Sequence, residues 1–189
     1  PKDFVFIAVF GILLFLVFIV FSIIFSANAN LCWFTHTVGA LFACTVFMYL
    51  AYRVPKRGAI AIMGIIVGAV GLLMGMFWSG PVGIVVGGIV ADLIAGDPQK
   101  RTKTKLICAF AAFTFCFWLG QISLILMMGE AYAEMCVQAG MTLEYGQTLV
   151  NSILSPMGVV TGAATIAGGL VGGFIGTKVF SKHFAKLGM

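Results

Sequence analysis

Ionisable side chains are scarce in the apolar parts of this sequence. Within the long apolar segments they are His36 and Asp92, each near a segment end. An imidazole can ligate a metal or exchange hydrogen bonds, whereas Asp92 is placed to cap a helix or to pair with a nearby Lys or Arg. Proton-coupled transporters usually carry ionisable residues in the middle of a span, so this pattern disfavours a proton relay.

Motifs for hydrolytic chemistry are missing from the sequence. It has no P-loop, no paired carboxylates, no His-Glu-x-x-His and no Gly-x-Ser-x-Gly, so an enzyme is the least favoured class. The five cysteines lack Cys-x-x-Cys spacing. We expect Cys44, Cys108 and Cys116 to be small buried apolar residues. Cys32 and Cys136 lie in connecting segments and could meet as a disulfide.

The composition indicates that the helices lie in a lipid bilayer. Of 189 residues, 61% are hydrophobic and 9% are charged, whereas a soluble domain has about 45–50% apolar and about 25% charged residues. So few charges cannot cover the surface of a soluble fold of this size. A soluble domain is therefore excluded, and so is a soluble nucleic-acid binder, despite the net charge of +5.

Six apolar segments are candidate membrane spans; five have about the 20 residues that a membrane helix needs or more, and the fourth along the chain is shorter. They are residues 4–25, 34–52, 59–78, 82–95, 106–128 and 157–177. Ser79-Gly80-Pro81 is typical of a turn, and residues 129–156 form a long loop. The unbroken apolar runs disfavour porin-like strands. The sequence predicts one all-α domain over residues 1–189, an integral membrane bundle of six transmembrane helices.

The basic residues all fall on one side of this predicted topology. They lie at positions 2, 53–57, 100–105 and 178–186. The positive-inside rule then places the N- and C-termini in the cytoplasm, in a multi-pass protein of the cell membrane. The external side holds the long loop 129–156, where Glu130, Glu134 and Val137 fit a short amphipathic helix. This helix is interpreted either as a solvated loop helix or as a lid over a ligand that enters from outside.

Glycine pairs four residues apart recur within residues 59–78, 82–95 and 157–177. Small residues at this spacing let helix backbones approach closely in lipid. Tight packing within the chain is the favoured interpretation, and docking against another membrane protein is the second. The first span carries many Phe and few small residues, so we expect it to face lipid in part.

Three segments resemble the Trep_Strep family, namely residues 54–64, 88–95 and 182–188, and the resemblance extends over the whole chain. Members of this family are taken to be substrate-binding S components of energy-coupling factor (ECF) transporters, a class of ABC importer. The resemblance implies a prokaryotic cell membrane and two kinds of partner, a transmembrane coupling protein and two cytoplasmic ATPases. It also implies that the chain itself is not an enzyme and has no intrinsic cofactor.

The resemblance also suggests where such partners dock. Many S components contact the coupling protein through an Ala-x-x-x-Ala pair on the first helix. Here Ala8 is followed at the fourth position by Ile12, and Gly11 by Phe15, so the pair is absent. Ala8 and Gly11 are the nearest small residues on that helix and are the docking candidates.

By the same resemblance, the ligand binds near the outer surface, under the loops that join spans 1–2, 3–4 and 5–6. The candidate residues there are Cys32, Trp33, Phe34, His36, Met74, Phe77, Trp78, Met128, Glu130 and Tyr132. No Lys or Arg is present there to pair with a phosphate or carboxylate, which disfavours a small, fully enclosed anion. Aromatic and thioether groups around one imidazole favour a planar apolar ligand whose polar edge stays in water.

Haem is the favoured ligand, because His is a common axial ligand of haem iron and Met a possible second. Some members of the resembled family have been connected with haem uptake. In this hypothesis His36 ligates the iron. The alternative for His36 is that it caps the start of span 34–52 by hydrogen bonding.

Other functions stay open on the sequence. One is an S component for another vitamin or precursor, cationic or neutral, stacked on Trp33 and Trp78 and approached by Glu130. Another is a bare transition metal held by His36, Cys32 and Met. A channel or structural membrane subunit outside the ECF class, assembled through the glycine faces, is the third.

Overall fold

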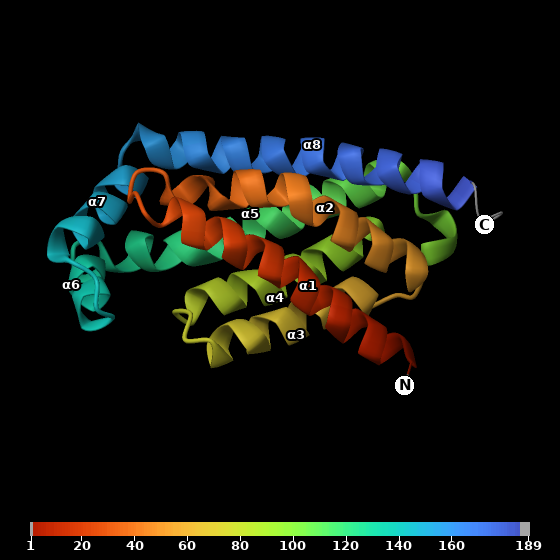
Figure 1. The fold of residues 1–189 in the computed structure, drawn as a ribbon, viewed down its shortest axis with the longest axis horizontal. Helices are drawn as coiled ribbons and strands as arrows, with labels where there is room; N and C mark the ends of the chain where they lie inside the picture. Colours follow the sequence, from red (N-terminus) through yellow and green to blue (C-terminus); the bar gives the residue numbers. More distant parts are fainter. Residues whose placement is uncertain (1, 186–189) are drawn as a thin grey trace.

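The computed structural model describes residues 2–185, with side chains described as far as residue 180. Within these residues the chain is 85% helical and forms no strand. Six helices make a bundle (Figure 1): α1 (Lys2–Phe25), α2 (Thr35–Arg53), α3 (Ala59–Leu73), α4 (Ser79–Ala95), α5 (Lys103–Met128) and α8 (Pro156–Ala185). Four shorter elements lie in the connections: η1 (Cys32–Phe34), η2 (Pro98–Lys100), α6 (Ala131–Gln138) and α7 (Leu143–Leu154).

Among the described residues, four helical segments are long and apolar enough to cross a membrane, namely Lys2–Phe25, Cys32–Arg53, Lys103–Met128 and Pro156–Phe180. The prediction of an all-α integral membrane protein is confirmed to this extent. Helices α3 and α4 have only 15 and 17 residues. At 1.5 Å per residue, α3 is about 22 Å long, shorter than the roughly 30 Å hydrocarbon core.

The boundary between α3 and α4 differs from the sequence prediction. Helix α3 ends at Leu73 instead of continuing to residue 78, and the turn is made by residues 74–78, with Gly75 at φ +84°. Ser79-Gly80-Pro81, predicted as the turn, forms the first turn of α4. Proline is tolerated there because the first helical N–H groups have no intrahelical acceptor to lose.

The long loop 129–156 contains two helices where one was expected. The predicted short helix is α6, and α7 follows it after a turn. Thr142 starts α7 by accepting a hydrogen bond from the amide of Tyr145 at 3.2 Å. Together the two helices make a hairpin at one end of the bundle (Figure 1).

The two ends of the bundle differ in their connections (Figure 1). One end, here the terminal end, holds both chain termini and the loops 54–58 and 96–102. The other, the loop end, holds residues 26–34, the turn 74–78 and the α6–α7 hairpin. Lys182 and Lys186, and with them the segment 182–188, lie outside the residues whose side chains are described.

At the terminal end, hydrogen bonds and an ion pair of charged side chains connect the loops 54–58 and 96–102. The guanidinium of Arg101 donates hydrogen bonds to the carbonyls of Ala51 and Lys56 at 3.3 and 3.2 Å. Burial lowers the pKa of Arg101, while nearby Asp92 and Asp97 raise it. Arg57 pairs with Asp97 at 3.7 Å. The loops that carry the basic residues are therefore fixed to the ends of α2 and α4.

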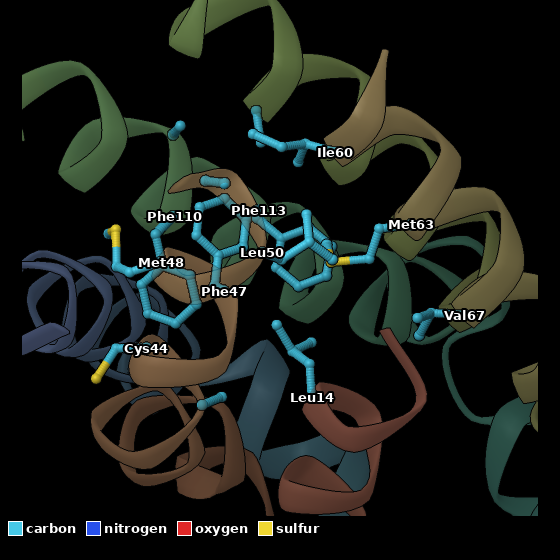
Figure 2. Packing of buried hydrophobic residues seen from close by; sticks show 14 of the residues in the cluster. Leu14, Cys44, Phe47, Met48, Leu50, Ile60, Met63, Val67, Phe110 and Phe113 are labelled. Carbon is cyan, nitrogen blue, oxygen red and sulfur yellow. The ribbon is translucent and has the colours of Figure 1, made fainter. Parts of the chain in front are cut away.

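The main core lies between α1, α2, α3, α4 and α5. Figure 2 shows Phe47, Phe110 and Phe113 packed together, with Leu14 and Met63 nearby, all of them fully buried or nearly so. The ring centroids of Phe47 and Phe110 are 5.0 Å apart. Of the three cysteines expected to be buried, Cys44 is buried, Cys116 is half-buried, and Cys108 is exposed on α5.

Glycines set the closest helix contacts. A Cβ added at Gly64 on α3 would lie 2.8 Å from the Cα of Gly88 on α4, and one at Gly83 would lie 2.6 Å from the Cα of Gly120 on α5. No real Cβ fits at such distances, so each contact requires glycine. These glycines pack within the chain, as the favoured interpretation has it, and are covered by neighbouring helices.

Candidate ligand-binding site

His36, in the first turn of α2, is a buried imidazole without a hydrogen bond. Its side chain is 1% exposed, and neither ring nitrogen has a partner among the described residues. The alternative in which His36 caps the start of its helix is therefore not what the structure shows. A buried polar group without a partner is uncommon and marks a place where a partner is missing or supplied from outside.

Two aromatic rings hold the imidazole. The ring of Phe117 on α5 meets His36 edge-on, with centroids 4.7 Å apart and planes at 89°. The ring centroid of Phe18 on α1 lies 6.2 Å from that of His36 and 5.4 Å from that of Phe117. Gly39 makes room for this cluster, because a Cβ there would lie 2.7 Å from Cδ1 of Phe18. Three helices thus converge on one imidazole.

His36 lines a cavity of ≈ 220 Å³ at the loop end, here called the His36 cavity. Its wall comes from α1, the start of α2, the turn 74–78 and α5. A second cavity of ≈ 400 Å³, here called the Tyr132 cavity, is bounded by the same turn and by the α6–α7 hairpin. Ser22, Met76 and Gln121 line both. The larger one is within the range of about 300–1,000 Å³ that is usual for small-molecule sites.

Neither cavity has a charged lining. No Asp, Glu, Lys or Arg is among the residues that line either of them. The polar groups are hydroxyls, one amide, one imidazole and one thiol, set among aromatic rings and thioethers. Such a lining fits a largely apolar molecule that is positioned by a few hydrogen bonds.

Half of the residues predicted for the site line these cavities. His36 and Met74 line the His36 cavity, and Cys32, Phe77 and Tyr132 line the Tyr132 cavity. The rings of Phe77 and Tyr132 are 5.8 Å apart at 70° and join the turn 74–78 to α6. The three connections at the loop end therefore meet around one space.

The other predicted residues lie elsewhere. Trp33 is 3% exposed and is buried in an apolar cluster, separate from the main core, that is formed with residues of α5, α6 and α7. A ligand ring therefore cannot stack on it in this conformation. Trp78 is 54% exposed on the outer side of the turn, a position typical of aromatic residues at a membrane–water interface. Phe34, Met128 and Glu130 line neither cavity. Stacking between Trp33 and Trp78 with Glu130 beside them is thus not an arrangement that the structure offers.

Several lining residues were missed by the sequence analysis. Phe18 and Ser22, one turn apart on α1, and Phe117 and Gln121, one turn apart on α5, face the His36 cavity. The available signal was a lone polar residue, Ser22 or Gln121, inside an otherwise apolar span, since polar groups inside a membrane tend to face the bundle interior.

Comparison with known proteins gives the family. The chain matches, over residues 1–186, the family described as a hypothetical bacterial integral membrane protein (Trep_Strep). The protein belongs to the Trep_Strep family. Searches of curated proteins and of solved structures gave no match. This Trep_Strep protein is therefore a bacterial integral membrane protein, in agreement with its long apolar helices.

The two cysteines at the loop end of the Trep_Strep protein are free thiols. Cys32 lines the Tyr132 cavity, and Cys136 is buried on α6. The disulfide considered from the sequence is not formed. Burial raises the pKa values of Cys136 and Tyr132 above their usual range. Within the described residues no cluster of three or more His, Cys, Asp or Glu could hold a bare metal ion.

The candidate docking residues on α1 differ in access. A Cβ at Gly11 would lie 3.1 Å from Cγ of Met63 and 3.2 Å from Cγ2 of Val67, so Gly11 is covered by α3. In this conformation it is not open to a partner protein. Ala8 is half-buried. The outward side of α1 carries large apolar residues, among them Phe4, Val5 and Ile23.

Proposed function

We propose that this protein is the substrate-binding S component of an ECF-type importer. It captures a small planar, largely apolar molecule at its loop end and delivers it through a coupling protein and two cytoplasmic ATPases. The observation that carries the proposal is the buried, unpartnered His36 beside two adjoining cavities that have no charged lining. In this proposal the chain is not itself an enzyme.

The orientation follows from the distribution of charge. The terminal end carries Arg53 at the end of α2, and Lys56, Arg57 and Lys100 in the connections. The turn 74–78, which lines both cavities, lies at the opposite end (Figure 1). In this proposal α1, α2, α3, α4, α5 and α8 all cross the membrane, the terminal end faces the cytoplasm, and the loop end faces outside. The α6–α7 hairpin then forms part of the outer wall of the Tyr132 cavity.

Haem is the ligand that we propose, with His36 as an axial ligand of the iron. A neutral imidazole suits iron, and Met74 and Met76 supply thioethers in the wall of the His36 cavity. Because the His36 ring is 1% exposed and packs against Phe117 and Phe18, a neighbouring ring must turn aside for the iron to reach a ring nitrogen. An aromatic side chain can do so by changing rotamer.

A spectral titration tests this role. The chain is purified in lipid nanodiscs and titrated with haem, while the Soret band is recorded for the wild type, for His36→Ala and for His183→Ala. His183 is the only other histidine of the chain and serves as the matched control. We expect His36→Ala to shift the Soret band and to weaken binding at least about tenfold, the effect of losing roughly 1.4 kcal/mol of binding free energy.

An unchanged Soret band and affinity in His36→Ala would remove the ligand role.

Co-purification separates the importer from a channel. An S component is expected to travel with an ATPase-bearing complex and to bind one small molecule per chain. A channel conducts in planar bilayers without either, and that result would overturn the proposal.

A further inference from the structure

Ser79, the first residue of α4, borders the Tyr132 cavity and carries a hydroxyl that nothing in the described chain uses. Its side chain is 2% exposed, and its Oγ has no hydrogen-bond partner. Other serine hydroxyls of the bundle donate a hydrogen bond to a nearby backbone carbonyl. Ser123 donates to the carbonyl of Gly120 at 2.7 Å, and Ser26 donates to the carbonyl of Ile23 at 3.1 Å.

The backbone at the same place adds a second free donor. The amide of Gly80 donates to the Phe77 carbonyl at 3.0 Å, and that of Val82 donates to the Trp78 carbonyl at 3.1 Å. Pro81 has no N–H. The amide of Ser79 has no acceptor among the described residues, and the preceding Trp78 supplies no side-chain cap. The amide and the hydroxyl of one residue are thus left unused together.

These donors lie at the positive end of a 17-residue helix. First-turn N–H groups and the helix dipole together favour a negative group at this position. Buried donors without a partner are costly, above all where lipid excludes water. An acceptor that arrives with the ligand removes this cost.

We propose that Ser79 and the N-terminus of α4 form a subsite for a carboxylate of the ligand. The inference rests on the proposed function and adds a chemical feature to the ligand, namely an acidic group beside its planar apolar body. A carboxylate oxygen accepts hydrogen bonds from the Ser79 amide and from the Ser79 hydroxyl. The hydroxyl proton is directed towards the carboxylate by rotation about the Cβ–Oγ bond. Both bonds are charge-assisted and are therefore stronger than bonds to a neutral acceptor.

Gln121 supplies a further donor from α5. A Cβ at Gly80 would lie 3.4 Å from Cγ of Gln121, so this side chain lies against the start of α4. Because Gln121, Ser22 and Met76 line both cavities, one molecule that extends from His36 to Ser79 passes along them. The uncharged lining matches a singly charged carboxylate held by neutral donors and disfavours a doubly charged phosphate, which usually needs Lys or Arg.

The test compares haem, which carries propionate carboxylates, with its dimethyl ester, in which they are uncharged. Affinities of both are measured by Soret titration in nanodiscs for the wild type, Ser79→Ala and Ser123→Ala. The Ser123 hydroxyl already donates to the Gly120 carbonyl, and Ser123 lines neither cavity, so it is the matched control. Taking the ratio of variant to wild type for each ligand cancels any difference in lipid partitioning.

We expect Ser79→Ala to weaken haem binding about tenfold, as loss of a charge-assisted bond implies, and to change binding of the ester by about twofold or less. Ser123→Ala is expected to leave both affinities unchanged. Gln121→Leu, a second variant on a different helix, should show the same selective loss. Thermal unfolding of each variant checks that it is folded.

An equal effect of Ser79→Ala on haem and ester, or no effect on either, overturns the subsite while leaving the haem-binding role intact. If the wild type shows no His36-dependent band with either ligand, the proposed haem-binding role fails, and the subsite fails with it. The two failures are therefore distinguishable in one set of titrations.

Discussion

Asp92, near the C-terminal end of α4, caps the start of α3 by accepting a hydrogen bond from the Gly58 amide at 2.8 Å. Its second oxygen accepts from the amide of Ile60 at 3.2 Å. Helix α3 has Gly58 at its N-cap and no cap from its own sequence. The charge that looked isolated in an apolar span thus satisfies first-turn donors of the neighbouring helix, which is the capping role expected from its place near the span end.

Replacing Asp92 should therefore destabilise the α3–α4 pair. We expect Asp92→Ala to lower the free energy of unfolding by about 1–2 kcal/mol, the range seen for lost caps. Asp97→Ala is the control, since Asp97 accepts from the amide of Gln99 in an exposed local turn, and its ion pair with Arg57 joins two exposed side chains and contributes little stability. Thermal unfolding in detergent measures both. Equal effects of the two substitutions would show that the contact between α4 and α3 adds nothing.

Gly168 on α8 should reject even the smallest side chain. A Cβ there would lie 2.6 Å from the carbonyl oxygen of Thr37 on α2. Ala usually stabilises a helix relative to Gly by roughly 0.5–1 kcal/mol, but overpacking costs about 1–3 kcal/mol. Gly168→Ala is therefore expected to lower the melting temperature. The adjacent Ala167→Leu, on an exposed face of α8, should leave it unchanged, and a stabilised Gly168→Ala would contradict this packing.

Tyr145 should make the hairpin sensitive to high pH. Its hydroxyl donates to the carbonyl of Ser26 at 2.7 Å, and burial, followed by the neighbouring Cys32, raises its pKa from 10.0 to about 12. Because the folded state holds this proton more tightly than the unfolded state, the stabilisation is complete below pH 10 and falls as the pH rises towards about 12.

Tyr145→Phe removes both the hydrogen bond and the titration. We expect it to cost about 1 kcal/mol of stability at pH 7, and the difference from the wild type should shrink between pH 10 and 12. Unfolding by urea at several pH values measures this. A gap that is constant over that interval would mean that Tyr145 does not titrate in the folded protein as described.

The proposed orientation can be tested by labelling. In a background without native cysteines, Lys100→Cys should react with a membrane-impermeant maleimide only in inside-out vesicles. Met141→Cys, in the exposed turn between α6 and α7, should react in intact cells. The expectation rests on the basic residues at the terminal end. Labelling of Lys100→Cys from outside would place the cavities on the cytoplasmic side and overturn the importer.

The sequence by itself determined where most helices lie and in what medium. Segments 4–25, 34–52, 106–128 and 157–177 match α1, α2, α5 and α8 within a few residues at their starts, and all but α8 also at their ends. Length and apolarity are enough for this, because every backbone group in lipid must be bonded within its own helix. The same pattern singled out His36 as a polar group close to the loop end.

Only the tertiary structure decided which faces meet. Lipid and protein core are both apolar, so α1 shows no amphipathic face that would reveal its inner side. Close glycine contacts set how the helices pack, and this packing places Phe18, Phe117 and Gln121 in the cavity walls. Trp33 is buried in an apolar cluster to which the α6–α7 hairpin contributes. The turn at residues 74–78 likewise depends on how α3 and α4 pack, and it is this turn that puts Ser79 at the start of a helix.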